Sequence, residues 1–124
     1  MFTVFFYKDS DGQEPVLEYI RGLINKTDKE SRIKANKILH YIDYLCEVGA
    51  QAREPYAKHL DGDIWELRPI RDRILYAAWD GQSFILLCHF MKKTQKTPPE
   101  EIEKAKRLFA DYRERSKDNE KKKP

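Results

Sequence analysis

Three lysines lie close together near the carboxyl-terminal end of the chain. Lys92, Lys93 and Lys96 fall within five residues that include no acidic side chain. Local clustering of positive charge indicates an anionic partner more strongly than the net charge of a protein does. Lysine binds phosphate oxygens as a compact point charge, so this cluster predicts contact with a phosphate-bearing ligand.

Two arginines lie shortly before this cluster, in segments that are rich in β-forming residues. If residues 69–72 form the turn between them, Arg68 faces Arg73 across a strand pair, and the two like charges repel unless an anion lies between them. Glu66 would provide that anion as a surface salt bridge worth at most about 1 kcal/mol. A phosphate is the alternative, because guanidinium groups offer planar, bidentate donors. The residues leave both interpretations open.

The histidines and cysteines show no spacing that is typical of a metal site. His40, His59 and His89 have no metal-ligand spacing with one another or with Cys46 and Cys88. The two cysteines lie in apolar segments, which indicates reduced core thiols rather than a disulfide. We therefore expect no metal and no other cofactor.

The composition is that of one globular domain with a charged exterior. Of the 124 residues, 36% are charged and 40% are hydrophobic, which suits a single core. Residues 113–124 hold six basic and three acidic side chains, so they account for the whole net charge of +3. The apolar start, residues 1–7, is too short for a membrane span or a signal peptide. We expect a cytoplasmic protein.

Periodicity and capping signals predict the secondary structure. Residues 2–7 are apolar on both faces and predict a buried strand. The other predicted elements, in chain order, are a helix from Pro15 to about Asn25, a helix from a Thr27–Glu30 capping box to Gly49, a short strand near residues 58–60, strands over residues 64–70, 73–79 and 83–91, and a helix capped by Thr97. Asp80 and Gly81 predict a hairpin turn between the last two strands.

This order of elements predicts an α+β domain over residues 1–112, followed by a charged, flexible tail over residues 113–124. In this domain, an N-terminal strand and a helical hairpin pack on one face of an antiparallel β-sheet meander. A C-terminal helix completes it. The chain shows no repeat and no linker that would define a second domain.

A two-residue turn at Asp80 and Gly81 gives the meander two distinct faces. The core face is expected to carry Trp65, Leu67, Ile74, Tyr76, Ile85, Leu87 and Met91. The other face, away from the helices, is expected to carry Glu66, Arg68, Arg73, Leu75, Phe84, Leu86, Cys88, Phe90 and Lys92. His89 falls on the core face opposite Asp72, which favours an imidazole tied to a carboxylate over a catalytic role.

Two stretches of the chain carry distinctive motifs. In residues 58–76, a Gly and a Trp-Glu-Leu-Arg strand precede an Arg-Ile-Leu-Tyr strand. In residues 86–98, an apolar strand ends in Lys-Lys-Thr, and Thr-Pro then opens a helix. Together they resemble the HigB-like, phage-derived branch of the RelE/ParE superfamily of bacterial toxins. The order of the predicted elements also agrees with that family, which implies a RelE-like fold.

The resemblance implies the toxin of a type II toxin–antitoxin system, neutralised by a HigA-like helix-turn-helix antitoxin. Such toxins cleave mRNA without a metal, commonly on the translating ribosome. Carried onto this chain, the resemblance implies that Arg73 and Arg68 stabilise the phosphate that the RNA 2′-hydroxyl attacks. Lys92 and Lys93 would hold the RNA backbone or assist the leaving 5′-oxygen.

Arg71, Lys96 and Lys58 are the remaining expected RNA contacts. The general base stays open among Glu66, His89 and a lysine. Two other functions also stay open, because one fold can serve several functions. Relatives of the ParE type bind DNA gyrase, and a non-catalytic RNA-binding module would use the same basic face.

Overall fold

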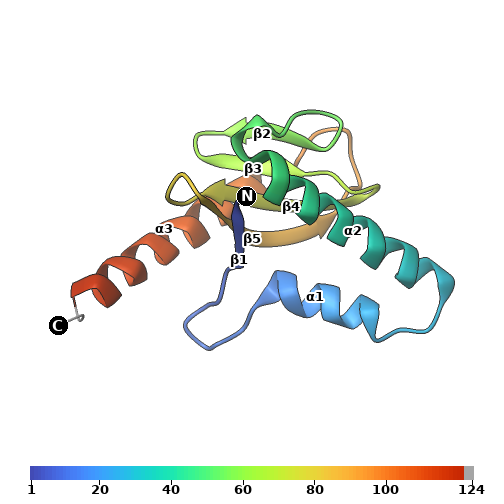
Figure 1. The fold of residues 1–124 in the computed structure, drawn as a ribbon, viewed down its shortest axis with the longest axis horizontal. Coiled ribbons are helices and arrows are strands. Elements are labelled where there is room, and N and C mark those ends of the chain that lie inside the picture. The colour runs from blue at the N-terminus through green and yellow to red at the C-terminus, as the bar shows by residue number, and fades with distance from the viewer. Residues whose placement is uncertain (122–124) are drawn as a thin grey trace.

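The computed structural model describes residues 1–121, and residues 122–124 lie outside the described part of the chain. In chain order, the elements are β1 (Thr3–Phe6), α1 (Pro15–Ile24), α2 (Lys29–Val48), a 3-10 turn η1 (Gly49–Gln51), β2 (Ala57–Asp61), β3 (Ile64–Leu67), β4 (Asp72–Ala78), β5 (Ser83–Met91) and α3 (Pro99–Lys121) (Figure 1). The α+β class and the order of elements predicted from the sequence are confirmed.

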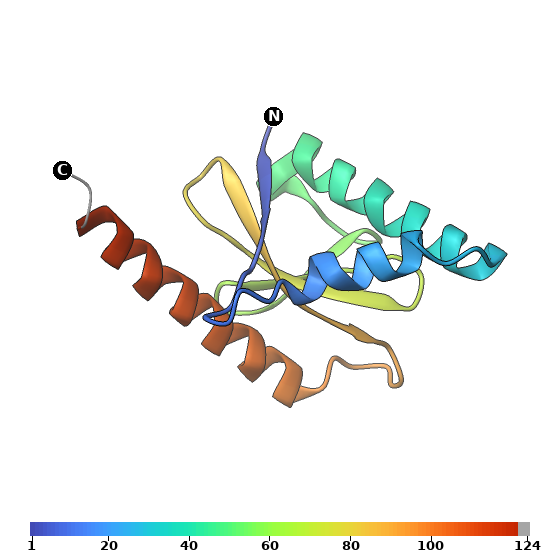
Figure 2. The same cartoon turned by 90° about the horizontal axis from the view of Figure 1, so that it is seen from below.

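The strands form a five-stranded sheet in the order β1-β5-β4-β3-β2. β2 to β5 make the predicted antiparallel meander, but β1 pairs with β5 in parallel, so the sheet is mixed. The α1–α2 hairpin carries the chain across one face of the sheet, between the two edge strands β1 and β2 (Figure 2). Thr3 and Phe5 of β1 are exposed, so the prediction of a strand buried on both faces is wrong.

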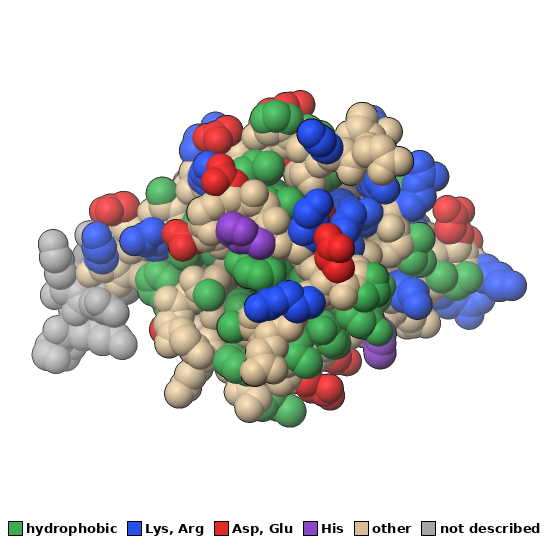
Figure 3. Space-filling view, turned by 90° about the horizontal axis from the view of Figure 1, so that it is seen from above, with side chains coloured by type: hydrophobic (Ala, Val, Ile, Leu, Met, Phe, Trp, Pro, Cys, Tyr) green, Lys and Arg blue, Asp and Glu red, His purple; other side chains and the backbone are tan. Residues whose placement is uncertain are grey.

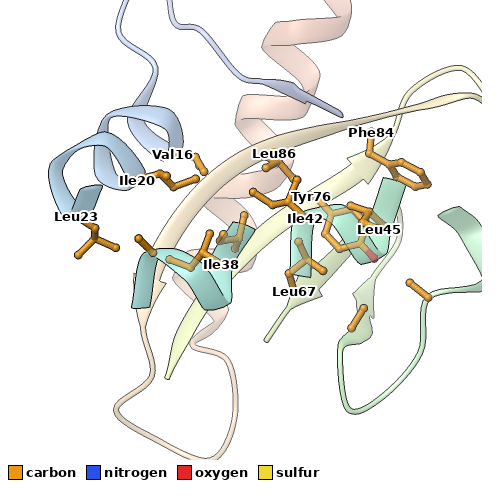
Figure 4. Close-up of a cluster of buried hydrophobic side chains, with 14 residues drawn as sticks. Val16, Ile20, Leu23, Ile38, Ile42, Leu45, Leu67, Tyr76, Phe84 and Leu86 are labelled. Atoms are coloured by element: carbon orange, nitrogen blue, oxygen red, sulfur yellow. The ribbon is translucent and has the colours of Figure 1, made fainter. Parts of the chain in front are cut away.

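Helices cover both faces of the sheet, so the prediction that they pack on one face is wrong. α1 and α2 pack on one side, around a cluster that includes Ile38, Leu45 and Tyr76 (Figure 4). α3 packs on the other side through Ala105 and Phe109. β4 and β5 are buried at consecutive positions along most of their length, so both of their faces need an apolar cover.

The β3–β4 register is as predicted, with Trp65 opposite Tyr76 and Leu67 opposite Ile74. The β4–β5 turn is one residue longer than predicted, because the Trp79 amide donates a hydrogen bond of 2.9 Å to the Ser83 carbonyl. The Asp80 carboxylate supports this longer turn from within. It accepts hydrogen bonds from the Gln82 amide at 3.1 Å and from the Ser83 hydroxyl at 2.7 Å.

The longer turn exchanges the two faces of β5 near the turn. Phe84 and Leu86 face α1 and α2, and Ile85 and Leu87 face α3, which is the reverse of the prediction. A β-bulge then follows, because Leu75 pairs with Cys88 while its neighbour Tyr76 pairs with Leu86. The extra residue restores the predicted faces for the rest of β5. The bulge therefore decides which side chains of β5 reach the candidate site.

Both ends of α2 are set by specific residues. The Asp28 carboxylate accepts a hydrogen bond of 2.9 Å from the Ser31 amide, so Asp28 is the N-cap in place of the capping box predicted one residue earlier. Gly49 ends the helix as predicted, with φ of 57°. A Cβ atom at this position would collide with the ring of Phe2.

α3 continues to Lys121, past residue 112, where the sequence analysis ended the domain. Arg115 donates to the Asp111 carboxylate at 3.0 Å and packs over the ring of Tyr7. Residues 113–121 are thus helical. The flexibility expected of residues 113–124 stays a prediction. Residues 122–124 lie outside the described part of the chain. Within residues 1–121, no helix has the length and apolar character needed to cross a membrane.

Both cysteines are free, as predicted. Cys88 is buried in the cluster beneath α3, and this burial raises the pKa of its thiol to about 12. A thiol with such a pKa stays protonated at neutral pH and is a poor nucleophile. Cys88 is therefore a packing residue.

Candidate functional site

Glu66 is a buried carboxylate between two arginines. It lies on the α3 side of the sheet, opposite Leu75, and only 2% of its side chain is exposed. Its Oε1 lies 3.5 Å from Arg68 Nε and 3.7 Å from Arg73 Nε. One interpretation of the sequence is a surface ion pair at this position, and the ion pair in the structure is buried. A buried charge is stable only when it is paired and hydrogen-bonded.

The backbone also holds Arg73 in place. Its Nη1 donates hydrogen bonds of 3.0 Å to the Ile70 carbonyl and 2.9 Å to the Asp72 carbonyl, and 7% of the side chain is exposed. Burial lowers the pKa of the Arg73 guanidinium, and the Glu66 carboxylate opposes that shift. Arginine remains protonated in proteins, so a positive charge lies just below the surface.

The segment that joins β5 to α3 closes over this ion pair. The Thr97 hydroxyl donates a hydrogen bond of 2.5 Å to Glu66 Oε2. The sequence predicts Thr97 as the cap of the last helix, but its side chain turns to the sheet instead. Glu66 therefore receives one neutral and two charged partners from three different parts of the chain.

The hollow that remains around Glu66 is small, with a volume of about 10 Å³. It is lined by Arg68 and Arg73, by the three clustered lysines and by residues of the covering segment: Glu66, Arg68, Arg73, Phe90, Lys92, Lys93, Thr94, Gln95, Lys96 and Thr97. The structure thus brings five of the seven predicted basic residues together, and Arg71 and Lys58 lie outside this hollow. A hollow of this size holds at most about one water molecule.

Arg68 brings an unused donor to this hollow. Its Nη1 lies 3.6 Å from the exposed Glu54 carboxylate, whereas its Nε is buried beside Glu66. Among the residues that the structure describes, this Nε has no hydrogen-bond partner. A buried charged donor without a partner is costly, so an anionic oxygen that reached it would be stabilised.

The sequence predicts the basic residues on a sheet face that no helix covers, and this prediction is wrong. α3 covers that face, and the cluster occupies its end, where the β5–α3 segment takes the place of the helix. Figure 3 shows lysine and arginine side chains spread over this side of the molecule, with acidic side chains beside several of them.

The two outer candidates lie apart from each other. Arg71 is exposed in the β3–β4 turn, and its carbonyl accepts a hydrogen bond of 2.7 Å from the Lys92 amide. With Lys92 and Lys93, Arg71 lines an open hollow of about 420 Å³. Lys58 pairs with Glu66 across β2 and β3, but it is exposed and lines a separate hollow at the β2 edge.

His89 lies on the opposite face of the sheet from Arg73. Its Nε2 is 2.9 Å from the Asp72 carboxylate, which also accepts a hydrogen bond of 2.7 Å from Tyr19, and the His89 and Tyr19 rings stack. Burial alone would raise the pKa of Asp72, but these two partners hold it below its usual value. The predicted carboxylate partner of His89 is confirmed, and the sheet separates this imidazole from the arginine pair.

Three side chains that contact these residues could not be identified from the sequence. Thr97 carried a signal, a threonine before two prolines, that is equally typical of a helix cap. Tyr19 and Lys34 carried none, because α1 and α2 bring them to Asp72 only by tertiary packing. Lys34 Nζ lies 4.0 Å from the Asp72 carboxylate.

The chemistry of the cluster is that of an anion site. Its positive charges come from arginine and lysine, and no group of three or more His, Cys, Asp or Glu side chains in the described residues is placed to hold a metal ion. Guanidinium and ammonium groups that converge in a partly dry site stabilise negative charge that develops on a phosphate. The arrangement can therefore stabilise negative charge that reaches the arginine pair.

A family model for phage-derived Gp49-like proteins (DUF891) matches residues 23–110, which include α2, all of the meander and the first half of α3. No curated protein matches the chain. The matched region contains every basic residue of the cluster and more than two thirds of the 124 residues. The chain therefore belongs to the phage-derived Gp49-like family, which is associated with RelE-like and toxin–antitoxin proteins.

Proposed function

We propose that this protein is the toxin of a type II toxin–antitoxin pair and that it cleaves messenger RNA, on the translating ribosome, without a metal. The observation that carries the proposal is the convergence of Arg68, Arg73, Lys92, Lys93 and Lys96 around one carboxylate. Membership of a family associated with toxin–antitoxin proteins supports it. A HigA-like helix-turn-helix antitoxin would neutralise the protein in the cytoplasm, where its mRNA substrate is translated.

The proposed reaction is an internal transfer at phosphorus. The 2′-oxygen of one nucleotide attacks the adjacent phosphorus, so the O2′–P bond forms while the P–O5′ bond breaks. The products are a 2′,3′-cyclic phosphate and a 5′-hydroxyl. One proton leaves the 2′-hydroxyl and one reaches the departing 5′-oxygen, so the reaction needs a proton acceptor, a proton donor and positive charge around the phosphate.

Arg68 and Arg73 would provide that positive charge. Arg68 Nε makes no hydrogen bond within the described residues and lies 3.5 Å from Glu66 Oε1, and Arg73 is fixed by two carbonyls and Glu66. Donors that are already oriented stabilise a developing charge without reorganising during the reaction. Lys92 and Lys93 would hold the RNA backbone or assist the leaving 5′-oxygen.

Of the two candidate bases Glu66 and His89, Glu66 shares the hollow with both arginines, whereas His89 lies on the other face of the sheet. The lysines of the hollow carry positive charge, so we assign them to the phosphate and the leaving oxygen. Glu66 Oε2 is occupied by the Thr97 hydroxyl. A phosphodiester needs more room than the present hollow of about 10 Å³. We therefore expect the segment from Lys92 to Thr97 to move when RNA binds, which would free Glu66 Oε2 to accept the 2′-hydroxyl proton.

The test is primer extension on a reporter mRNA, with and without ribosomes, comparing wild type with Arg68→Ala. Arg68 suits this test better than Arg73, because Arg73 is 5% exposed and its loss would also disturb the fold. We expect Arg68→Ala to cleave about 100-fold more slowly, the cost of losing one donor to a developing oxyanion. Lys37→Ala, which removes an exposed lysine of α2 that lies outside the cluster, is the matched control.

Two results would contradict the proposal. One is a folded Arg68→Ala protein that cleaves at the wild-type rate. The other is wild-type protein that stops growth and DNA replication while cellular mRNA stays intact, as expected of a toxin that binds gyrase.

A further inference from the structure

A further hollow, of about 450 Å³, lies where α2 begins and the β3–β4 turn meets the end of β5. Its walls are mainly apolar. Ile33, Ile70 and Met91 line it and are 48%, 51% and 44% exposed. Large aliphatic side chains that gather at a hollow in this way usually mark a binding surface. Lys29, Lys34 and Arg71 line the same hollow.

This apolar hollow adjoins the candidate site around the end of the sheet. It shares Ile70 and Arg71 with the open hollow of about 420 Å³, which in turn shares Lys92 and Lys93 with the small hollow around Glu66. The three hollows therefore lie in a row around this end of the sheet, with the apolar one on the α2 side and the arginine pair on the α3 side. We call this row of hollows the strand groove.

The charges along the strand groove favour a polyanion. Its open part is lined by five cations, Lys29, Lys34, Arg71, Lys92 and Lys93. The acids that line it are Glu30, which is exposed, and Asp72, which is buried, bonded to His89 and Tyr19, and 4.0 Å from Lys34. Lys34 therefore shares its charge with Asp72, and the other four cations have no acidic partner among the residues that line the hollows. Successive cations at this density follow a phosphate backbone rather than a single anion.

The backbone at Ile70 is a second, independent indication of function. Ile70 has φ of 55°, the left-handed conformation that a β-branched side chain rarely adopts. Because half of this side chain is exposed, core packing does not explain why an isoleucine occupies a position that suits Gly or Asn. Local strain of this kind is retained mostly where it presents a side chain to a ligand.

We propose that the apolar end of the strand groove is a nucleobase subsite. One unstacked base of the RNA would lie between Ile33, Ile70 and Met91, while Arg71 and Lys92 hold the phosphates that lead from it to the arginine pair. Arginine planes, thioethers and aliphatic side chains all pack against the face of a base. This inference rests on the proposed function, because it assigns the RNA path into the same site.

An acidic protein segment is the main rival occupant, because the hollow is apolar with a basic rim. The row of cations from this hollow toward the arginine pair favours RNA instead, since a docked protein segment would not need cations in the adjoining hollow of about 420 Å³. The experiment below treats the protein segment as an outcome.

The test compares Ile70→Asn with Ile24→Asn. Both remove an isoleucine that is about half exposed, but Ile24 lies at the end of α1, outside the groove. Binding is measured with a short single-stranded RNA carrying 2′-O-methyl groups, which removes the attacking hydroxyl. We expect Ile70→Asn to bind at least about fivefold more weakly, as for the loss of one base-stacking contact. Its Tm should equal or exceed that of wild type, because Asn tolerates the left-handed conformation.

Kinetics and abasic oligonucleotides provide two further measurements. On ribosome-bound reporter mRNA, Ile70→Asn should raise KM with little change in kcat, because the subsite binds ground state and transition state alike. Removing single bases from the oligonucleotide should identify one position whose loss weakens wild type but does not weaken Ile70→Asn further. That non-additivity would place the base against Ile70.

The outcomes separate this inference from the proposed function. Wild-type protein that cleaves mRNA, with Ile70→Asn equal to it in affinity and KM, overturns the base subsite alone. An Ile70→Asn protein that keeps RNA binding and cleavage but escapes neutralisation by its antitoxin also overturns it, in favour of protein docking. Failure of the wild type to cleave mRNA with or without ribosomes overturns the proposed function itself.

Discussion

At the scale of single residues, Glu66 belongs to the candidate site and also contributes to the stability of the fold. Its carboxylate faces the guanidinium groups of Arg68 and Arg73 and accepts a hydrogen bond from Thr97. A buried ion pair is costly to form and costlier to break, because removal of one partner leaves the other charge uncompensated. Glu66 therefore orients both arginines and makes their burial possible.

Replacing this carboxylate should destabilise the protein. We expect Glu66→Gln to lower the free energy of unfolding by about 3 kcal/mol, because Arg73 stays charged and buried without its anion. Urea unfolding measures the loss, and Glu54→Gln is the control, since Glu54 contacts Arg68 from an exposed position. Addition of Arg73→Met to Glu66→Gln should recover part of the stability. Equal unfolding midpoints for Glu66→Gln and Glu54→Gln would disprove the pairing.

At the scale of elements, the segment between β5 and α3 decides whether the site is open. It carries Lys92, Lys93 and Lys96 over the arginine pair, and the Thr97 hydroxyl fastens it to Glu66. Most of its residues are exposed. A segment with few buried apolar contacts opens at low free-energy cost, so one hydrogen bond can control access to a buried site.

Loss of that hydrogen bond should loosen the segment without removing any group that the proposed reaction uses. We expect Thr97→Val to speed amide hydrogen exchange over residues 92–97, because a buried acceptor on Glu66 loses its donor at a cost of about 1–3 kcal/mol. Cleavage should be as fast as in wild type or faster. Thr94→Val is the control, since the Thr94 hydroxyl bonds only to the Lys96 carbonyl within the same segment. Identical exchange in both variants would show that Thr97 does not hold the segment closed.

At the scale of the whole molecule, the helical hairpin contacts the edge of the sheet where the end of α2 lies against the start of β1. The Phe2 amide donates a hydrogen bond of 2.8 Å to the Cys46 carbonyl, and the Phe2 ring fills the space where a side chain at position 49 would lie. This contact joins the edge strand to the helical hairpin. It therefore helps to set the hairpin above the meander that carries the site.

Two glycine substitutions should have opposite effects. Gly49→Ala combines a positive φ with a collision against Phe2, and we expect it to lower the free energy of unfolding by about 2 kcal/mol. Gly22 lies within α1 with open space around its Cα, so Gly22→Ala should raise it by about 0.5–1 kcal/mol. Thermal unfolding of both variants measures the difference. A Gly49→Ala protein as stable as wild type would mean that α2 and β1 can separate without cost.

The sequence by itself determined the elements and most of the basic cluster, because these depend on local patterns. Period-3.6 stripes define the helices, and the length and β-branched content of each apolar run define the strands. The β3–β4 register also followed from the sequence, since a short turn between Arg68 and Arg73 allows few alternatives. That register is what placed Glu66, Arg68 and Arg73 near one another.

Tertiary structure alone decided which of these residues share a site. The burial of a side chain, and the face of the sheet on which it lies, depend on distant parts of the chain. The longer turn at Asp80 and the bulge at Leu75 set the faces of β5, and they leave His89 across the sheet from Arg73. Packing of α3 on the second face buried Glu66, and the position of Thr97 closed the hollow above it. No local pattern encodes these contacts, since each joins segments that meet only in the folded chain.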